Sequence, residues 1–318
     1  MNDDYQTEFR EEVHIEELNE VELYFEDTGP KSAPVLFYLH GGPGYNSYSF
    51  RDIVGESLAR YRVIYLDQRG GGRSGRLPNN GDLSYFTIDA LTDDVEAIRA
   101  FLGIEKFIPF GHGFGAVIAL EYARRFPQHV NFTLLVNPWI NFPELSQTLL
   151  EKASEITGQP LTSIPHDPET RVERAFAMLN SRDLLSRLHF PNANGRLRLE
   201  FSDSESALLA GGELQDGLVT NGLWEFEYAS FLADVSRPIA VIAGMLDPTA
   251  YPAQSDWLVD LGGAQLAELE DCGHYPWLED LDAFVQAVGY FEVAENELSG
   301  TDAESINAWP ITESSAAS

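Results

Sequence analysis

Residues 111–115 read GHGFG, and they lie between an apolar run, KFIPF, and a helical run, AVIALEYARRFP. A sharp strand-to-helix turn of sequence G-x-S-x-G holds a nucleophilic serine, because the strained turn exposes its central side chain. Here the central residue is Gly113, which has no side chain. The pattern therefore predicts a nucleophile position that lacks the attacking oxygen.

An acid and a base follow two later apolar strands, in the loops GMLDP (244–248) and DCGHYP (271–276). A hydroxyl becomes a good nucleophile when an imidazole takes its proton, and a carboxylate fixes the tautomer of that imidazole. We expect His274 to be the general base and Asp247 to orient it. The chain order of positions 113, 247 and 274 matches the Ser, Asp, His order of α/β-hydrolases.

A further loop, HGGPG at 40–44, follows another apolar strand. The oxyanion formed in acyl transfer needs backbone N–H donors, and losing one typically costs about 10²–10³ in rate. Glycine lets the backbone approach a ligand closely. We therefore expect the N–H groups of Gly42 and Phe114 to form the oxyanion hole.

The elements that must position these loops alternate along the chain. EEVHIEEL and VELYFEDTG predict two strands near the N-terminus, and a helix is expected near 50–60. Leu91, Val95, Ile98 and Leu102 share one helical face, and helix 115–126 follows the GHGFG turn. Such alternation predicts an α/β fold with a mostly parallel sheet and helices on both faces.

The alternation lapses between about 141 and 231 and then resumes. The sequence predicts a first core part over 1–140, a helical cap over 141–231 and a second core part over 232–294, ending in a helix over 280–291. Residues 295–318 are polar, small and without periodicity, which predicts a disordered acidic tail.

The composition excludes several classes of partner. The chain has 318 residues and a net charge of −31, a field that repels nucleic acids and anionic membranes. No run approaches the ~20 apolar residues of a membrane span, and the acidic N-terminus does not resemble a signal peptide. Cys272 is the only cysteine, so no intrachain disulfide can form and a cytoplasmic location is expected.

HGGPG together with DQRGGGRS (67–74), the elbow and the Asp and His loops resembles the proline iminopeptidase family of α/β-hydrolases, over roughly residues 10–292. The resemblance implies a serine aminopeptidase that removes an N-terminal residue, usually proline, from a small peptide. It also implies a helical cap, and neither metal nor organic cofactor. Asp67 and Arg69 are expected to brace loops rather than to react.

The resemblance further implies cap carboxylates that bind the substrate's free amine, because a desolvated ammonium needs an anionic partner. The usual cap signature of the family is absent. Glu213 is the first choice, and the other candidate carboxylates and the aromatic wall of the pocket are Glu205, Glu225, Glu227, Trp224, Phe226 and Tyr228.

The remaining reactive side chains are expected to be structural or inert. His14, His129, His166 and His189 are interpreted as surface or structural, and His112 is expected to point away from the elbow. Ser74 lies on a different loop from the elbow and is not expected to replace the missing nucleophile. Nothing near Cys272 in the sequence activates its thiol.

Three functions remain open at this stage. The first is a proline iminopeptidase-type serine aminopeptidase made inactive by a serine-to-glycine replacement at 113. The second is an esterase or lactonase with the same triad. The third is a non-catalytic protein that binds a small molecule. The sequence does not predict an oligomeric state.

Overall fold

The computed structural model describes residues 9–75, 82–191, 193–208 and 212–298. Its eight-stranded sheet has the order β1-β2-β4-β3-β5-β6-β7-β8. The strands are β1 (Phe9–Leu18), β2 (Val21–Pro30), β3 (Val35–Leu39), β4 (Arg62–Asp67), β5 (Ile108–His112), β6 (Thr133–Val136), β7 (Ile239–Gly244) and β8 (Gln265–Leu269).

The helices follow the strands in the order that the sequence predicts. They are α1 (Tyr48–Val54), α2 (Ile88–Phe101), α3 (Gly115–Arg125), α4 (Phe142–Thr157), α5 (Pro168–Met178), α6 (Arg182–Ser186), α7 (Ala193–Ser206), α8 (Glu213–Thr220), α9 (Ala253–Gly262), α10 (Pro276–Glu279) and α11 (Leu281–Leu298). Short 3₁₀ turns are η1 (Leu83–Tyr85), η2 (Pro127–His129), η3 (Leu223–Glu225) and η4 (Ala229–Asp234).

The sheet is mostly parallel, as predicted. Only the β1–β2 and β2–β4 pairs run antiparallel, and the five pairs from β3–β4 to β7–β8 run parallel. The carboxyl ends of β3, β5, β7 and β8 therefore meet at one edge of the sheet, where ligands bind in such folds. This edge carries all the loops on which the sequence analysis places the chemistry.

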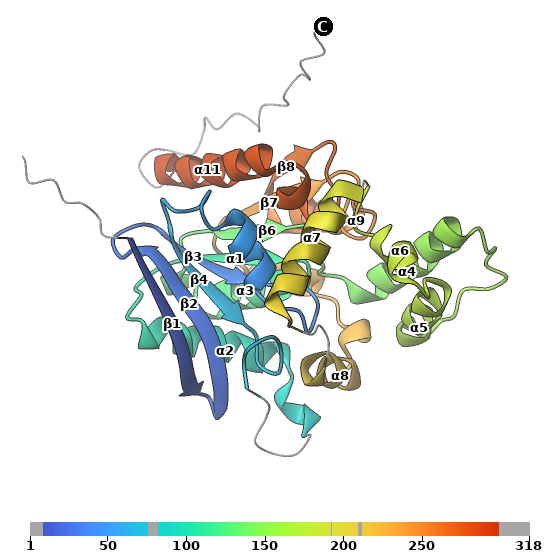
Figure 1. Cartoon of the computed structure of the whole chain (residues 1–318), viewed down its shortest axis with the longest axis horizontal. Coiled ribbons are helices and arrows are strands. Elements are labelled where there is room, and N and C mark those ends of the chain that lie inside the picture. Colours follow the sequence, from blue (N-terminus) through green and yellow to red (C-terminus); the bar gives the residue numbers. More distant parts are fainter. Residues whose placement is uncertain (1–8, 76–81, 192, 209–211, 299–318) are drawn as a thin grey trace, which may run out of the picture.

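Helices cover both faces of the sheet, which is also as predicted. Within β3 the side chains alternate, so that Phe37 and Leu39 join one hydrophobic cluster while Leu36 and Tyr38 join the other. The first cluster includes α2 and α3, and the second includes α1 and α11. Figure 1 shows α11 and α2 on opposite sides of the strands.

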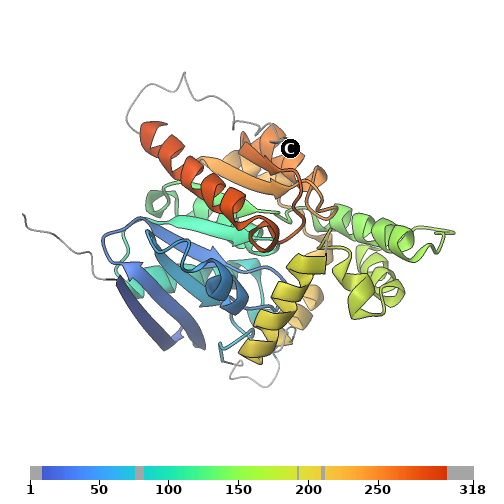
Figure 2. The same ribbon diagram turned by 45° about the horizontal axis from the view of Figure 1, so that its top comes forward.

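Between β6 and β7 the described residues form α4 to α8, η3 and η4, and no strand longer than an isolated bridge. Figures 1 and 2 show α4, α5 and α6 standing out from one end of the sheet, whereas α7 lies beside α1. The Ser202 hydroxyl of α7 donates a hydrogen bond of 2.9 Å to the Asp52 carboxylate of α1. The division into core and cap at 141 and 231 stays a prediction.

Two helix ends differ from the sequence-based prediction. α1 ends at Val54, because the next residues form turns rather than the helix expected up to about 60. α11 continues to Leu298, so the predicted tail begins inside this helix. Residues 299–318 lie outside the described part of the chain. No described helix combines the length and apolar character that a membrane crossing requires.

The loop after β4 is braced by ion pairs, as expected for Asp67 and Arg69. Asp67 accepts hydrogen bonds from the Ser47 backbone N–H at 2.8 Å and from Arg73 Nε at 2.8 Å. Arg69 donates from Nε and Nη2 to the two Asp94 oxygens at 2.6 and 2.5 Å, and both side chains are almost completely buried. These bonds hold the 67–74 loop against the loop that follows β3 and against α2.

We predict that Arg69→Met lowers the free energy of unfolding by about 3–5 kcal/mol, because it leaves the Asp94 carboxylate buried without its partner. Urea denaturation measures this change. In the control Arg69→Met/Asp94→Leu, which removes both charges, most of the lost stability should return. A single variant that loses less than about 1 kcal/mol would show that the pair does not brace the loop.

Candidate active site

The turn from β5 into α3 places Gly113 at the carboxyl edge of the sheet. Gly113 has φ +52°, a conformation that other residues adopt only with strain. The flanking glycines are fixed by close packing: a Cβ on Gly111 would lie 2.5 Å from the Gly115 carbonyl oxygen, and one on Gly115 would lie 2.1 Å from the Leu39 carbonyl oxygen. The GHGFG sequence thus forms the sharp elbow that the pattern predicts.

Asp247 and His274 come from the loops after β7 and β8 and meet as the sequence analysis expects. His274 Nδ1 lies 2.7 Å from Asp247 Oδ2, and both side chains are buried. The other Asp247 oxygen, Oδ1, accepts from the Thr249 backbone N–H at 2.8 Å and from its hydroxyl at 2.6 Å. Three hydrogen bonds therefore hold the carboxylate in one orientation.

The electrostatics favour an ionised Asp247. Burial alone would raise the pKa of this carboxyl, but the His274 imidazole and the hydrogen bonds from Thr249 bring the pKa below its ordinary value. An ionised carboxylate can only accept, so the proton of the shared hydrogen bond belongs to His274 Nδ1. In the neutral imidazole, Nε2 then carries the free lone pair.

That lone pair belongs to the nitrogen that faces the elbow. A Cβ built on Gly113 would lie 3.1 Å from His274 Nε2, 3.4 Å from His274 Cε1 and 3.7 Å from the Gly41 Cα. The structure thus brings together the three positions expected to form a triad. The base is oriented toward a residue that carries no side chain.

Two other histidines surround His274: His112, which was expected to point away from the elbow, and His189, which was interpreted as surface or structural and is structural here. The His112 ring does not point away from the site: its centroid is 4.6 Å from that of His274, and its Nε2 donates 2.9 Å to the His274 carbonyl. His189 lies 4.9 Å from His274 between ring centroids, and its carbonyl accepts from the His274 N–H at 2.9 Å. Both were missed because neither sequence neighbourhood reveals a contact across more than 80 residues.

Both neighbours are electrically neutral near pH 7. Burial, reinforced by His274, lowers the pKa of His112 well below its ordinary value and lowers that of His189 to about 3. The indole of Trp139 stacks on His274 at 5.1 Å between centroids. His274 is therefore held between aromatic rings, and it differs from His112 and His189 in having a carboxylate partner.

The two residues expected to form the oxyanion hole lie on the loops that flank this position. Phe114 is the N-cap of α3, and the first N–H groups of a helix have no acceptor within it. Gly42 has φ +120°, and the neighbouring Gly41 is the nearest HGGPG residue to the side-chain position of Gly113. Donation by Gly42 and Phe114 stays a prediction.

Of the four acids proposed for the amine, Glu205 lies on α7, Glu213 on α8, Glu225 on η3 and Glu227 between η3 and η4. Within the described residues, no hydrogen bond or ion pair joins any of them to the triad positions. Glu205 is exposed on α7, Glu213 is half-buried at the start of α8, and Glu225 is exposed. Glu225 and the half-buried Glu227 line a depression of about 600 Å³ beside Trp257.

The aromatic candidates pack into the interior. Trp224 packs edge-on against Phe142, 5.9 Å between centroids. Phe226 is half-buried beside it, and the buried Tyr228 donates to the Glu121 carboxylate at 3.0 Å.

A different carboxylate between β6 and β7, Asp203 of α7, lies beside the loop that follows β3. It accepts a short hydrogen bond from the hydroxyl of Tyr45, the residue that follows HGGPG. Burial, together with the charge of Asp203, raises the pKa of Tyr275, the residue next to His274. Sequence reasoning missed Asp203 because the run FSDSES has no feature that distinguishes one acid from another.

The other reactive side chains are structural or inert. Ser74 donates to the Asp67 carbonyl at 2.5 Å and accepts from the Tyr24 N–H at 2.9 Å. Cys272 is buried, and burial together with the nearby Glu279 raises the pKa of its thiol to about 12, so no thiolate forms near pH 7. His129 is half-buried, and His166 is exposed.

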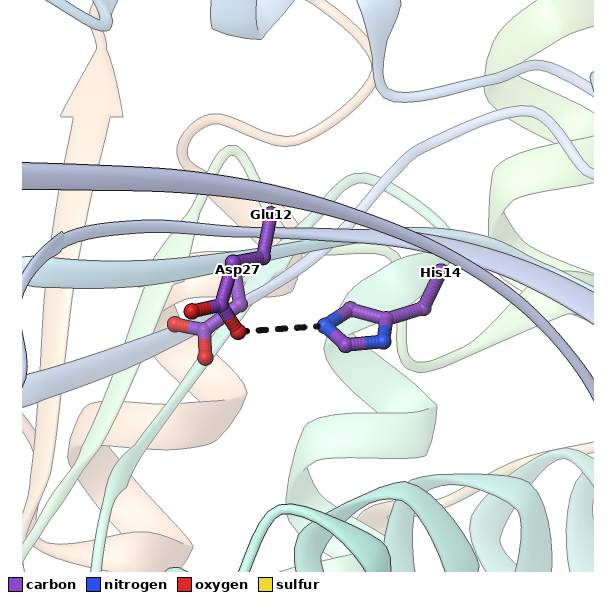
Figure 3. A group of neighbouring side chains, drawn as sticks. All are labelled: Glu12, His14 and Asp27. Carbon is purple, nitrogen blue, oxygen red and sulfur yellow. Dashed lines mark ion pairs between the residues drawn. The ribbon is translucent and has the colours of Figure 1, made fainter.

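One group of side chains resembles a metal site. Glu12, His14 and Asp27 lie together on β1 and β2, with His14 Nε2 3.8 Å from a Glu12 oxygen (Figure 3). Asp27, however, accepts from Arg62 Nε at 2.8 Å and from Lys31 Nζ at 2.8 Å. Burial alone would raise the pKa of Asp27, but these two cations lower it. The carboxylate is already neutralised, which favours an ion-paired sheet edge over a metal site.

Comparisons with known proteins agree with this geometry. Residues 34–281 match the family model described as alpha/beta hydrolase fold. A proline iminopeptidase from Xanthomonas citri is 40% identical over 309 residues, which cover 85% of this chain and 92% of that protein.

Two solved structures extend the comparison. A proline iminopeptidase-related protein from Thermus thermophilus has a TM-score of 0.81 at 38% identity, covering 90% of this chain and 98% of its own. A thermophilic esterase from Thermogutta terrifontis has a TM-score of 0.63 at 20% identity, covering 90% and 99%, and thus shares the fold.

The chain belongs to the alpha/beta hydrolase fold family. Within that family it is proline iminopeptidase-like, as its relatives over most of the chain show.

The loop that carries His274 is held by a titratable acid, Glu279 of α10. Its Oε2 accepts from the Gly273 N–H at 2.5 Å, one residue before His274. Burial, with a smaller contribution from the charge of Asp247, raises the pKa of Glu279 from 4.5 to about 7. The folded state therefore binds this proton more tightly than the unfolded state does.

We predict that Glu279 makes the protein less stable as the pH rises from about 4.5 to about 7. The stabilisation of the folded state by the protonated Glu279 carboxyl is complete below pH 4.5 and is lost as the pH rises through the folded-state pKa of about 7. Glu279→Gln should remove this part of the pH dependence, so the variant should gain stability relative to the parent at the upper end of the range. Urea denaturation at several pH values measures the difference.

The exposed acid Glu205 provides the control, since Glu205→Gln should leave the pH profile parallel to that of the parent. Parallel profiles for parent and Glu279→Gln would contradict the assignment of a raised pKa to Glu279.

Proposed function

We propose that the chain has the acyl-transfer site of a proline iminopeptidase-type serine aminopeptidase, with glycine in place of the nucleophilic serine. The observation that carries this proposal is the alignment of Asp247, His274 and position 113, with Nε2 3.1 Å from the place where a Cβ would lie. As it stands the chain binds a small peptide or related molecule but cannot form an acyl-enzyme. Removal of such a nucleophile costs about 10⁶ in kcat.

The roles follow from the geometry. In the serine form, the hydroxyl at 113 attacks the scissile carbonyl while His274 Nε2 takes its proton. Asp247 stabilises the resulting imidazolium and keeps Nδ1 as the donor. The N–H groups of Phe114 and Gly42 bind the oxyanion, and His274 then gives the proton to the leaving amine.

Asp203 supports the aminopeptidase over an esterase. A peptide's free ammonium loses its hydration in a closed site and needs a carboxylate there. Asp203 lies on α7, it is partly buried, and its hydrogen bond to Tyr45 fixes it beside the HGGPG loop. We propose Asp203, rather than Glu213, Glu225 or Glu227, as the amine-binding residue.

Two alternatives use the same residues. An esterase or lactonase needs the same triad and oxyanion hole but no carboxylate for an amine. A protein that only binds a ligand needs neither a nucleophile nor a base, and a native glycine at 113 favours it. The intact Asp247–His274 pair supports a site built for hydrolysis, whether evolution or the laboratory removed the serine.

We predict that Gly113→Ser creates a prolyl aminopeptidase, raising the rate on proline β-naphthylamide by at least about 10⁴-fold over the parent. Gly113→Ala is the matched control, because it introduces the same Cβ at φ +52° without the hydroxyl. Both variants should be about 1–2 kcal/mol less stable than the parent, because a Cβ is strained in this conformation. Fluorogenic assays and thermal unfolding measure the two effects.

The outcomes separate the alternatives. If Gly113→Ser cleaves only p-nitrophenyl acetate, the triad is correct and the amine site is wrong. Adding Asp203→Asn to the serine variant should lower kcat/KM for the prolyl amide at least about tenfold and leave the ester reaction unchanged. A folded serine variant that is inactive on both substrates would contradict the hydrolase proposal and favour a binding role.

A further inference from the structure

We propose a further activity for the chain with glycine at 113: His274 and Asp247 activate a water molecule directly, so that the protein hydrolyses small activated esters without an acyl-enzyme. This inference rests on the proposed function, because it uses the same base and the same oxyanion hole. It differs from that function in the nucleophile, in the absence of a covalent intermediate and in the class of substrate.

The first support is the space beside Gly113. The position that a Cβ would take on Gly113 lies 3.1 Å from His274 Nε2 and 3.7 Å from the Gly41 Cα. Glycine frees the volume of a hydroxymethyl group at this point. A water oxygen is about as large as the hydroxyl oxygen that serine would supply, and hydrogen bonds to imidazole need about 2.7–3.2 Å.

The second support is that the base does not depend on a nucleophile to hold it. The His274 carbonyl accepts from His112 Nε2 at 2.9 Å and from Asn137 Nδ2 at 3.0 Å. Its backbone N–H donates to His189, and its ring stacks on Trp139. The imidazole therefore keeps its orientation when no serine hydroxyl is bonded to Nε2.

The third support is the charge of the surroundings. His112 and His189 are neutral near pH 7, so no neighbouring imidazolium opposes the positive charge that His274 acquires. The ionised Asp247 at 2.7 Å stabilises that charge. These are the conditions that a general base requires.

The reaction balances without any further reactant. Water loses one proton to His274 Nε2 while its oxygen forms a bond to the ester carbonyl carbon, and the carbonyl electron pair becomes the oxyanion. Collapse of this intermediate breaks the bond to the leaving oxygen, which departs with its electron pair. The leaving oxygen takes the proton from His274 Nε2. One ester and one water therefore give one carboxylic acid and one alcohol or phenol.

The substrate class follows from the size of the effect. A positioned general base typically contributes about 10²–10⁴ in rate, far less than a complete triad. An amide has a poor leaving group and would still react slowly. Aryl and enol esters with small acyl groups have good leaving groups, so a single base accelerates their hydrolysis measurably.

The test measures p-nitrophenyl acetate hydrolysis by the parent, His274→Gln and Gly113→Ala. The parent should exceed the buffer rate with linear kinetics, and intact-mass spectrometry should detect no acetyl adduct. His274→Gln should lose at least about 10²-fold of the enzymatic rate because the base is gone. Gly113→Ala should lose at least about tenfold, because its methyl group occupies the place of the water.

Gly113→Ser is the positive control, since it should show a burst of nitrophenol and an acetyl adduct. Hydrolysis that survives in His274→Gln, or an adduct on the parent, would overturn the proposal. So would a parent rate equal to that of buffer. In the last case, a serine variant that cleaves the prolyl amide leaves the proposed function intact, whereas one that is inactive on both substrates removes both proposals. Circular dichroism confirms that each variant is folded.

Discussion

The close packing of α3 against β3 is the constraint on which the site depends. A Cβ on Gly115 would lie 2.1 Å from the Leu39 carbonyl oxygen, so only glycine allows the helix to begin this near the sheet. This contact forces the sharp turn after β5 and fixes Gly113 at φ +52°. The elbow then faces the loops that follow β7 and β8. The geometry of an attacking residue is therefore retained although the attacking atom is missing.

The site also depends on the electrostatic surroundings of His274. The chain carries a net charge of −31, yet the residues around His274 are neutral imidazoles and aromatic rings with one carboxylate. Burial keeps His112 and His189 unprotonated, and His274 together with the hydrogen bonds from Thr249 keeps Asp247 ionised.

The sequence allowed the fold and the three central positions to be predicted, because both depend on local patterns. Apolar runs ending in glycine-rich loops place Asp247 and His274 at the carboxyl edge of a parallel sheet, where their side chains meet. The contacts of His112, His189 and Asp203 could not be predicted, because they join residues that are distant in the chain. Asp203 reaches Tyr45 only because α7 packs on α1, and helix packing of this kind leaves no local signature.

The central claim is that His274 is a base whose free nitrogen, Nε2, faces position 113. Nitrogen NMR of the imidazole rings, at a pH at which the His274 ring is neutral, tests it most directly, with the His274 signals assigned by their loss in His274→Gln. We predict that the neutral His274 ring has its proton on Nδ1 and none on Nε2, and that the Nδ1–H signal shifts strongly in Asp247→Asn. A neutral His274 ring with its proton on Nε2 would contradict this claim, because that nitrogen could then accept a proton from neither serine nor water.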